Sequence, residues 1–342
     1  MKQRNIRLFF FTFFFLCSAV SLHAQYWGVW QKTHNITLGL SQDEKWVFFL
    51  QKNDAGITNI FKVELKTNAV TPVTNFTDRP VLGGIALFGK QPAVVYSRAA
   101  SAKGDDIHLY RYNILTADPP VDFTPNDATS NKKILGLAYN GRYVYYTSDK
   151  GAGTKTDTYR YDCNQYIIEL AFANDKDYET MCWSRDQTHL LLKKPSTADI
   201  YSYSIETTDK QKLFLPFHPD DLKTVFYDPM NTAYYMISNK NTLTKGDTAL
   251  DLMHESVFPS GNGVISANLS LGGKYIHALT ADGEKIIEIP SYHTIDMPAG
   301  ANDLLISPKE TSVLYVNMDA VKQKLYLFDI VKKTTKELTT IK

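Results

Sequence analysis

A short pattern, a polar turn followed by an apolar strand-like run, recurs seven times along the chain. It is clearest in "SQDEKWVFFLQKNDAGITNIFKVELKTNAVTPVTNF", residues 41–76, where two hydrophobic runs lie between polar turns. The apolar runs of the seven copies begin at Trp46, Ala93, Tyr143, His189, Ala233, Tyr275 and Val313. Successive starts are 47, 50, 46, 44, 42 and 38 residues apart. A repeat of about 45 residues that contains only strand-like segments is typical of a β-propeller, in which each repeat forms one four-stranded blade.

Each copy of the repeat divides into four expected strands. The first contains glycines and small side chains, as in "ITLGL" (36–40), which suit the crowded axis of a propeller. The second is the aromatic run, and its continuous apolarity fits a sheet that neighbouring blades cover on both faces. The third includes "NIFKVEL" (59–65), and the fourth is more polar, as an exposed edge requires. In the irregular fifth copy we expect the third strand around residues 247–256.

The repeats run from about residue 35 to about residue 340, so we expect no second domain within these residues. Aromatic residues make up 13% of the chain, and they favour strands. We therefore predict an all-β fold: a single seven-bladed β-propeller of four-stranded antiparallel blades over residues 25–342, with six blades as the alternative. The leader "QYWGVWQKTH" (25–34) is expected to add a strand to the last blade and so to close the ring.

Residues 1–24 have the pattern of a secretory signal peptide. Three basic residues precede the apolar run "LFFFTFFFLCSAVSL" (8–22), and Ala24 provides a small residue before the expected cut. The run is shorter than the roughly 20 residues that span a bilayer, so we expect cleavage and no stable membrane insertion. The mature domain is therefore expected in the periplasm, at the cell surface or outside the cell.

Removal of this segment changes the charge balance of the chain. The 37 Lys and Arg residues fall to 34, against 36 Asp and Glu, so the mature net charge is −2. Without a basic excess, nucleic acid is not an expected partner. Two cysteines remain, Cys163 and Cys182. An exported chain can keep them as a disulfide or as two separate buried thiols, and the sequence leaves both alternatives open.

The first copy carries a recognisable series of residues: Ser41, Asp43, Lys45, the apolar run to Phe49, Gly56, Asn59, Ile60, Phe61, Glu64, Leu65, Thr67, Val73 and Thr74. This series resembles the TolB-like, WD40-like repeat called PD40, and other copies keep parts of it. The resemblance implies one of three roles: an exported binding domain, the regulatory propeller of a prolyl-oligopeptidase-like enzyme, or a lyase. The motif itself defines a blade and carries no chemistry.

Catalytic signatures are missing from the sequence. It contains no Gly-x-Ser-x-Gly nucleophile elbow, and a metal-dependent lyase would need several His and acidic side chains that converge on one ion. The loop "PFHPDD" (216–221) is the most suggestive metal candidate, but a solvated turn explains it equally well. We expect no metal and no cofactor. Structural roles are predicted for three histidines in aromatic columns and for the polar residues that open the third strands: His108, His189, His277, Asn59, Asp106, Asp157 and Asp199.

Long connections between second and third strands are expected to share one face with the blade-to-blade connections. They are "SRAASAKGDD" (97–106), "SDKGAGTKTD" (148–157) and "SNKNTLTKGD" (238–247). With the loop 216–221 they supply a mixed-charge rim that we predict to contact a partner: Arg98, Lys103, Lys150, Lys155, Lys240, Lys245, His218, Asp220 and Asp221.

The sequence therefore predicts a non-catalytic binding or scaffolding module for a protein or peptide in the bacterial periplasm or cell envelope. The alternative is a carbohydrate-active lyase or hydrolase with its site at the channel mouth. Only fold-level analogy separates the two at this point, because one fold hosts many functions.

Overall fold

The computed structural model describes residues 37–41, 43–87, 93–101, 106–116, 118–124, 130–138, 142–149, 156–174, 178–184, 186–213, 222–227, 233–238, 243–247, 253–256, 263–289, 291–318 and 322–341. No helix in these ranges is long and apolar enough to cross a membrane. The predicted signal peptide and the leader lie outside the described residues.

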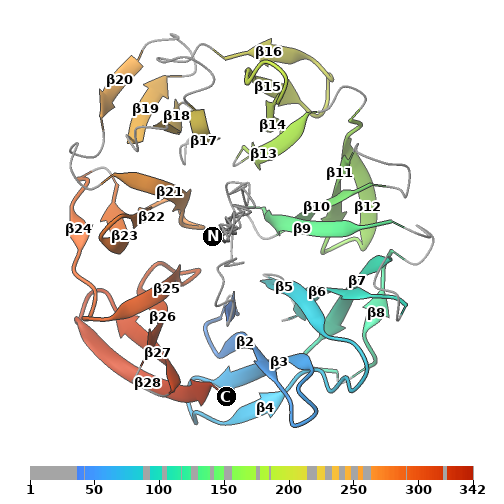
Figure 1. Cartoon of the computed structure of the whole chain (residues 1–342), viewed down its shortest axis with the longest axis vertical. Helices are drawn as coiled ribbons and strands as arrows, with labels where there is room; N and C mark the ends of the chain where they lie inside the picture. Colours follow the sequence, from blue (N-terminus) through green and yellow to red (C-terminus); the bar gives the residue numbers. More distant parts are fainter. Residues whose placement is uncertain are drawn as a thin grey trace, which may run out of the picture.

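Seven four-stranded antiparallel sheets form a ring, and each sheet uses four consecutive strands, so blade 1 is β1–β4 and blade 7 is β25–β28 (Figure 1). The innermost strands are β1 (Thr37–Leu40), β5 (Val81–Leu87), β9 (Lys132–Leu137), β13 (Glu179–Trp183), β17 (Leu222–Tyr227), β21 (Val264–Leu269) and β25 (Ala301–Ile306). The second strands are β2 (Trp46–Lys52), β6 (Ala93–Ala99), β10 (Tyr143–Ser148), β14 (His189–Lys193), β18 (Ala233–Ser238), β22 (Tyr275–Thr280) and β26 (Ser312–Met318).

The outer half of each blade completes the sheet. The third strands are β3 (Thr58–Glu64), β7 (Ile107–Asn113), β11 (Asp157–Asp162), β15 (Ile200–Ser204), β19 (Leu243–Asp247), β23 (Gly283–Glu288) and β27 (Gln323–Asp329). The outermost are β4 (Val70–Pro72), β8 (Val121–Asp122), β12 (Ile167–Phe172), β16 (Lys210–Lys212), β20 (Met253–Ser256), β24 (Thr294–Ile295) and β28 (Thr334–Ile341). The predicted all-β, seven-bladed propeller is confirmed, and six blades are excluded.

The predicted strand positions hold closely for the aromatic runs. Six of the seven second strands begin at the predicted residue, and the seventh begins at Ser312, one residue before Val313. The prediction for the third strand of blade 5 is wrong. This strand is β19, "LTKGD", and the segment expected to form it contains the outermost strand β20 instead. The reason is that β19 is polar and short, so it lacks the aromatic signal that marks third strands elsewhere.

The aromatic strands are buried on both faces, which explains their continuous apolarity. In β2, Phe48 packs into a cluster with Val94 and Tyr96 of blade 2, whereas Phe49 packs with Leu314 of blade 7. Both phenylalanines are fully buried. Successive side chains of one strand therefore fill two different blade-to-blade interfaces.

The ring closes between blades 1 and 7 by side-chain packing. A single cluster joins Leu40, Val47, Phe49 and Val63 of blade 1 to Leu314, Val316, Leu325, Leu338 and Ile341 of blade 7. The Lys336 ammonium also donates to the Leu65 carbonyl, and the Asn68 amide donates to the Glu337 carbonyl at 3.3 Å. The four described strands of blade 7 all come from the C-terminal segment. The leader that is expected to add a strand to this blade lies outside the described residues.

Cys163 and Cys182 are separate thiols. Cys163 and Cys182 are both free and buried. Burial raises the pKa of Cys163 to about 12 and also raises that of Cys182, which favours the protonated, unreactive form. Of the two alternatives left open by the sequence, the structure shows the second.

Candidate functional site

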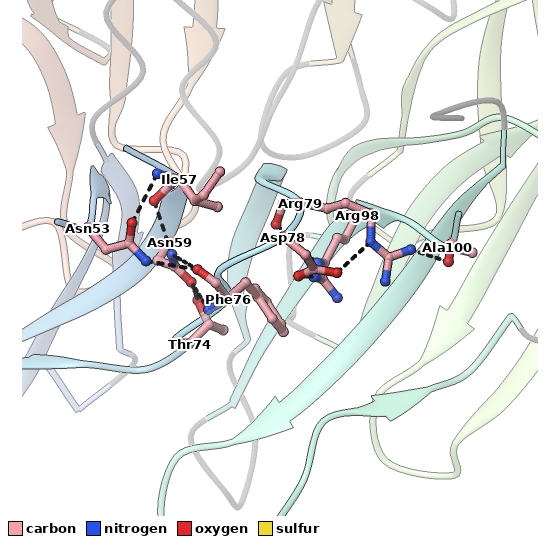
Figure 2. A network of polar contacts seen from close by, with 9 residues as sticks. All are labelled: Asn53, Ile57, Asn59, Thr74, Phe76, Asp78, Arg79, Arg98 and Ala100. Atoms are coloured by element: carbon pink, nitrogen blue, oxygen red, sulfur yellow. Dashed lines mark hydrogen bonds and ion pairs between the residues drawn. The ribbon is translucent and has the colours of Figure 1, made fainter. Parts of the chain in front are cut away.

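The connections between second and third strands emerge at the same end of the ring as the blade-to-blade connections, because neighbouring strands are antiparallel. We call this end the long-loop face. Figure 2 shows its polar framework where blade 1 meets blade 2. Asn59, at the start of β3, is fully buried there. Its side-chain oxygen accepts from the Phe76 amide (2.7 Å) and the Thr74 hydroxyl (2.9 Å), and its side-chain nitrogen donates to the Phe76 carbonyl (3.1 Å) and the Ile57 carbonyl (3.0 Å).

These bonds tie β3 to the connection that leads into the next blade. Asn53 adds a further bond, from its side-chain nitrogen to the Phe76 carbonyl at 2.8 Å. The recurrence of Asn or Asp at this position therefore reflects a structural role, as predicted. Asp157 repeats the arrangement in blade 3, where it accepts from the Asn174 amide at 2.8 Å.

Arg98 is the centre of the second half of the framework. It lies near the end of β6 and is 8% exposed. The sequence predicted that Arg98 belongs to a long connection, whereas the structure shows that it is part of a strand. Its guanidinium stacks 3.6 Å above the Phe76 ring, pairs with Asp78, and donates to the Arg79 carbonyl at 3.2 Å. Figure 2 shows Phe76 between the Asn59 bonds and this ion pair. A cation held in this way is worth up to about 2 kcal/mol where the ring is shielded from water.

His108 stands between two carboxylates in blade 2. Its Nδ1 faces Asp122 at 2.5 Å and its Nε2 faces Asp106 at 3.1 Å, and the side chain is 10% exposed. Asp122 in turn accepts from the Thr124 amide at 2.9 Å. Because the carboxylates take opposite ring nitrogens, they cannot share one metal ion with this histidine. The predicted structural role of His108 is confirmed.

The other two histidines assigned to aromatic columns are also held by the fold. His277 Nε2 lies 3.2 Å from Glu284, whose side chain is fully buried and accepts from the Leu304 amide at 2.7 Å. His189 Nδ1 lies 2.7 Å from the Thr188 hydroxyl. Both contacts orient the ring inside a blade, as the sequence predicted.

A buried cluster at the start of blade 3 was not foreseen from the sequence. The Lys132 ammonium donates to the Ser130 hydroxyl at 2.7 Å, and the Ser148 hydroxyl donates to the same oxygen at 3.3 Å. All three residues are at most 2% exposed, so no substrate reaches them in this conformation. Serine and lysine at strand ends give no signal in a single sequence, and only the pairing of β9 with β10 brings them together.

The predicted rim residues fall into two groups. Arg98 and Lys245 are described, and both lie in strands: Lys245 is in β19, where its ammonium stands 5.9 Å from the Tyr235 ring centroid. The structure places them in blades 2 and 5, so it does not bring them together. The remaining candidates lie outside the described residues: Lys103, Lys150, Lys155, Lys240, His218, Asp220 and Asp221.

The framework has a pH dependence that can be measured. A hydrogen bond from Arg79 and the charge of Arg98 hold the pKa of Asp78 below its ordinary value. The stabilisation from this carboxylate is therefore complete above the ordinary carboxyl range and is lost as the pH falls through the lowered native pKa. We expect the melting-temperature difference between wild type and Asp78→Asn to be constant between about pH 6 and about pH 8 and to shrink below about pH 4. Asp118→Asn, at an exposed site between β7 and β8, is the control for removal of a surface carboxylate. A difference between wild type and Asp78→Asn that grew on acidification would contradict the assignment.

Comparison with known proteins places the chain by its fold. No family model and no curated protein matches the sequence. Among solved structures, TolB from Acinetobacter baumannii is similar, with a TM-score of 0.51 and 12% identity over 89% of this chain and 85% of that protein. An oligogalacturonate lyase from Vibrio parahaemolyticus has a TM-score of 0.62 and 11% identity over 90% of each chain.

A puromycin-hydrolysing peptidase from Mycobacterium tuberculosis is similar over 92% of this chain, with a TM-score of 0.65 and 12% identity, but the match covers only 56% of the peptidase. Identities this low establish the fold and leave the activity open. The seven four-stranded blades, together with these similarities, show that the chain has a β-propeller fold similar to that of TolB.

Proposed function

We propose that this chain is an exported, non-catalytic module that engages a protein or peptide partner through its long-loop face. The observation that carries the proposal is the framework in which the buried side chains of Asn59 and Arg98 hold Phe76 and Asp78, and which fixes the bases of the connections at this face. A prearranged surface loses less conformational entropy when a partner binds, so rigid bases under variable loops favour recognition. The ionisable groups of the framework are engaged in contacts within the fold.

The proposal predicts that crosslinks form from the long-loop face and not from the opposite end of the ring. A photoreactive phenylalanine derivative at position 103 or 150 in the full chain, expressed in a bacterial host, should capture one defined protein or peptide. The control position is Val331, which is 79% exposed in the turn between β27 and β28 at the other end of the ring. The crosslinked product should be found in the envelope or the medium. The mass of the propeller chain in this product should lack residues 1–24.

Two results would contradict the proposal. Equal capture from position 331 would remove the preference for the long-loop face. An intact N-terminus in the cytoplasmic fraction would remove the proposed export, because signal cleavage accompanies secretion.

A carbohydrate-active lyase or hydrolase is the alternative function. A solved oligogalacturonate lyase in complex with manganese is similar in fold, with a TM-score of 0.61 and 11% identity. Within the residues that the structure describes, no group of three or more His, Cys, Asp or Glu side chains is arranged to hold a metal ion. Uptake of about one equivalent of Mn²⁺ by the full chain in equilibrium dialysis would favour this alternative over the binding module.

A further inference from the structure

The outermost strand of blade 3 departs from the polar edge that the sequence predicts. β12 has six residues, "IIELAF", and three of its apolar side chains are exposed: Ile167 (49%), Ile168 (38%) and Leu170 (50%). The other outermost strands are shorter, except β28, which is eight residues long and rich in Thr, Lys and Glu. A long apolar edge with unpaired backbone groups is a template for another strand, and soluble proteins ordinarily protect such edges.

The exposed side chains of β12 continue onto blade 2. Ile168 is paired with Tyr161, whose ring stacks 4.1 Å from Phe123 of blade 2, so this face of β12 looks towards β8. Val121, which is 60% exposed, belongs to β8, the outermost strand of blade 2, and blade 2 is next to blade 3 in the ring (Figure 1). Tyr166, 57% exposed, precedes β12. We call Val121, Tyr166, Ile168 and Leu170 the rim patch.

The guanidinium of Arg111 lies next to the rim patch, and no carboxylate of the described residues pairs with it. Arg111 is paired with Val121 across β7 and β8, and its guanidinium lies 4.6 Å from the Tyr166 ring centroid. Its Nε is buried and has no hydrogen-bond partner, and its Nη2 donates to the Tyr166 hydroxyl at 3.4 Å. Among the described residues, no carboxylate forms an ion pair with Arg111. An uncompensated, half-buried guanidinium favours a carboxylate ligand, because charge-assisted pairs with arginine are strong and directional.

We propose that β12 accepts an extended, acidic peptide segment of a protein partner as the fifth strand of blade 3. The peptide backbone pairs with the free edge of β12, its alternate apolar side chains cover Ile168 and Leu170, and an Asp or Glu side chain binds Arg111. This is strand addition, in which backbone bonds supply affinity and alternate side chains supply specificity. The inference rests on the proposed function in taking a polypeptide as the partner, but it assigns that partner to a different surface from the long-loop face.

Selection of peptides on the full chain tests the inference. The probe is a phage-displayed library of random twelve-residue peptides, followed by fluorescence anisotropy of the enriched sequences as synthetic peptides. We expect alternating apolar residues with an acidic residue, and binding that weakens about tenfold in Leu170→Lys. Val331→Lys is the matched control, since it introduces the same charge at an exposed apolar residue far from β12. Both sites are exposed, so both variants should melt like the wild type.

The arginine variants separate charge from packing. Arg111→Met should lose the preference for acidic peptides while it keeps the preference for apolar alternation, and Arg111→Lys should restore part of the acidic preference. Selected peptides that bind Leu170→Lys and wild type equally would overturn the inference. Peptides that respond instead to replacement of residues 101–105 would overturn it in favour of the long-loop face. A dimer that Leu170→Lys dissociates in sedimentation experiments would overturn it in favour of a second copy of the chain.

Discussion

Phe49→Ala is expected to destabilise the propeller by about 3–5 kcal/mol, the usual cost of removing a fully buried phenylalanine. Phe49 is fully buried in the cluster that joins blade 1 to blade 7, and its ring stacks 5.9 Å from Phe61. Because this interface is held by side-chain packing and a few exposed polar bonds, the cavity weakens the joint at which the first and last blades meet. The free energy of unfolding from urea titration measures the loss.

The strands in which hydrogen exchange becomes faster show whether a variant weakens ring closure or the packing of the core elsewhere. Phe226→Ala removes an equally buried ring from the large cluster that spans blades 2–6, and it should cost a similar free energy. Hydrogen exchange should differ between the variants, with faster exchange in β1 and β26 for Phe49→Ala and in the strands around β17 for Phe226→Ala. Equal exchange in β1 and β26 for the two variants would show that this interface is not a separate point of closure.

Asn59→Ala is expected to destabilise the protein by about 3 kcal/mol, because it leaves several polar groups without their hydrogen-bond partner at once. The Phe76 amide and the Thr74 hydroxyl lose their acceptor, and the carbonyls of Phe76 and Ile57 lose a donor. Thermal and urea unfolding give the change in stability. Since the same connection carries Asp78, the variant should also weaken the ion pair with Arg98 and reduce photo-crosslinking at position 103.

Two further variants show whether the loss comes from this bonding pattern. Asn59→Asp keeps the acceptor for Phe76 and Thr74 but loses both donors, so its stability should fall between wild type and Asn59→Ala. Asn302→Ala removes an exposed asparagine with one bond to the Gly300 carbonyl and should stay within about 0.5 kcal/mol of wild type. An Asn59→Ala variant as stable as Asn302→Ala would mean that water replaces the lost bonds and that the framework is not rigid.

Sequence reasoning proposed the candidate face but misjudged the setting of one of its members. It identified Arg98 as part of a long connection, whereas β6 extends through this residue and buries its side chain. The aromatic run ends before Arg98, so the sequence carries no sign that the strand continues. The partner that makes burial tolerable is Asp78, which is 20 residues away and lies in the preceding connection. An isolated pattern cannot predict such a pair, because the cost of burying one charge depends on where the other lies.

The outermost strands also combine features that the sequence predicted with one feature that it did not. Most of them are short or polar as expected, but β12 exposes Ile168 and Leu170, and nothing in "IIELAF" separates an exposed edge from a buried strand. The same exposed surface includes Val121 of the neighbouring blade 2, whose outermost strand β8 has only two residues. The rim patch is therefore a property of two blades together.

The sequence by itself predicted the repeating blade, the starts of the aromatic strands and the structural histidines, and it favoured seven blades with six as the alternative. Each follows from side chains that alternate or recur within about 45 residues, and local periodicity records them directly. Only the tertiary structure decided how blades 1 and 7 join, which thiols stay apart, where Arg98 finds its counter-charge and which edge remains apolar. These depend on residues that are distant in the chain, such as Leu65 and Lys336, 271 positions apart, and contact between them exists only once the ring has closed.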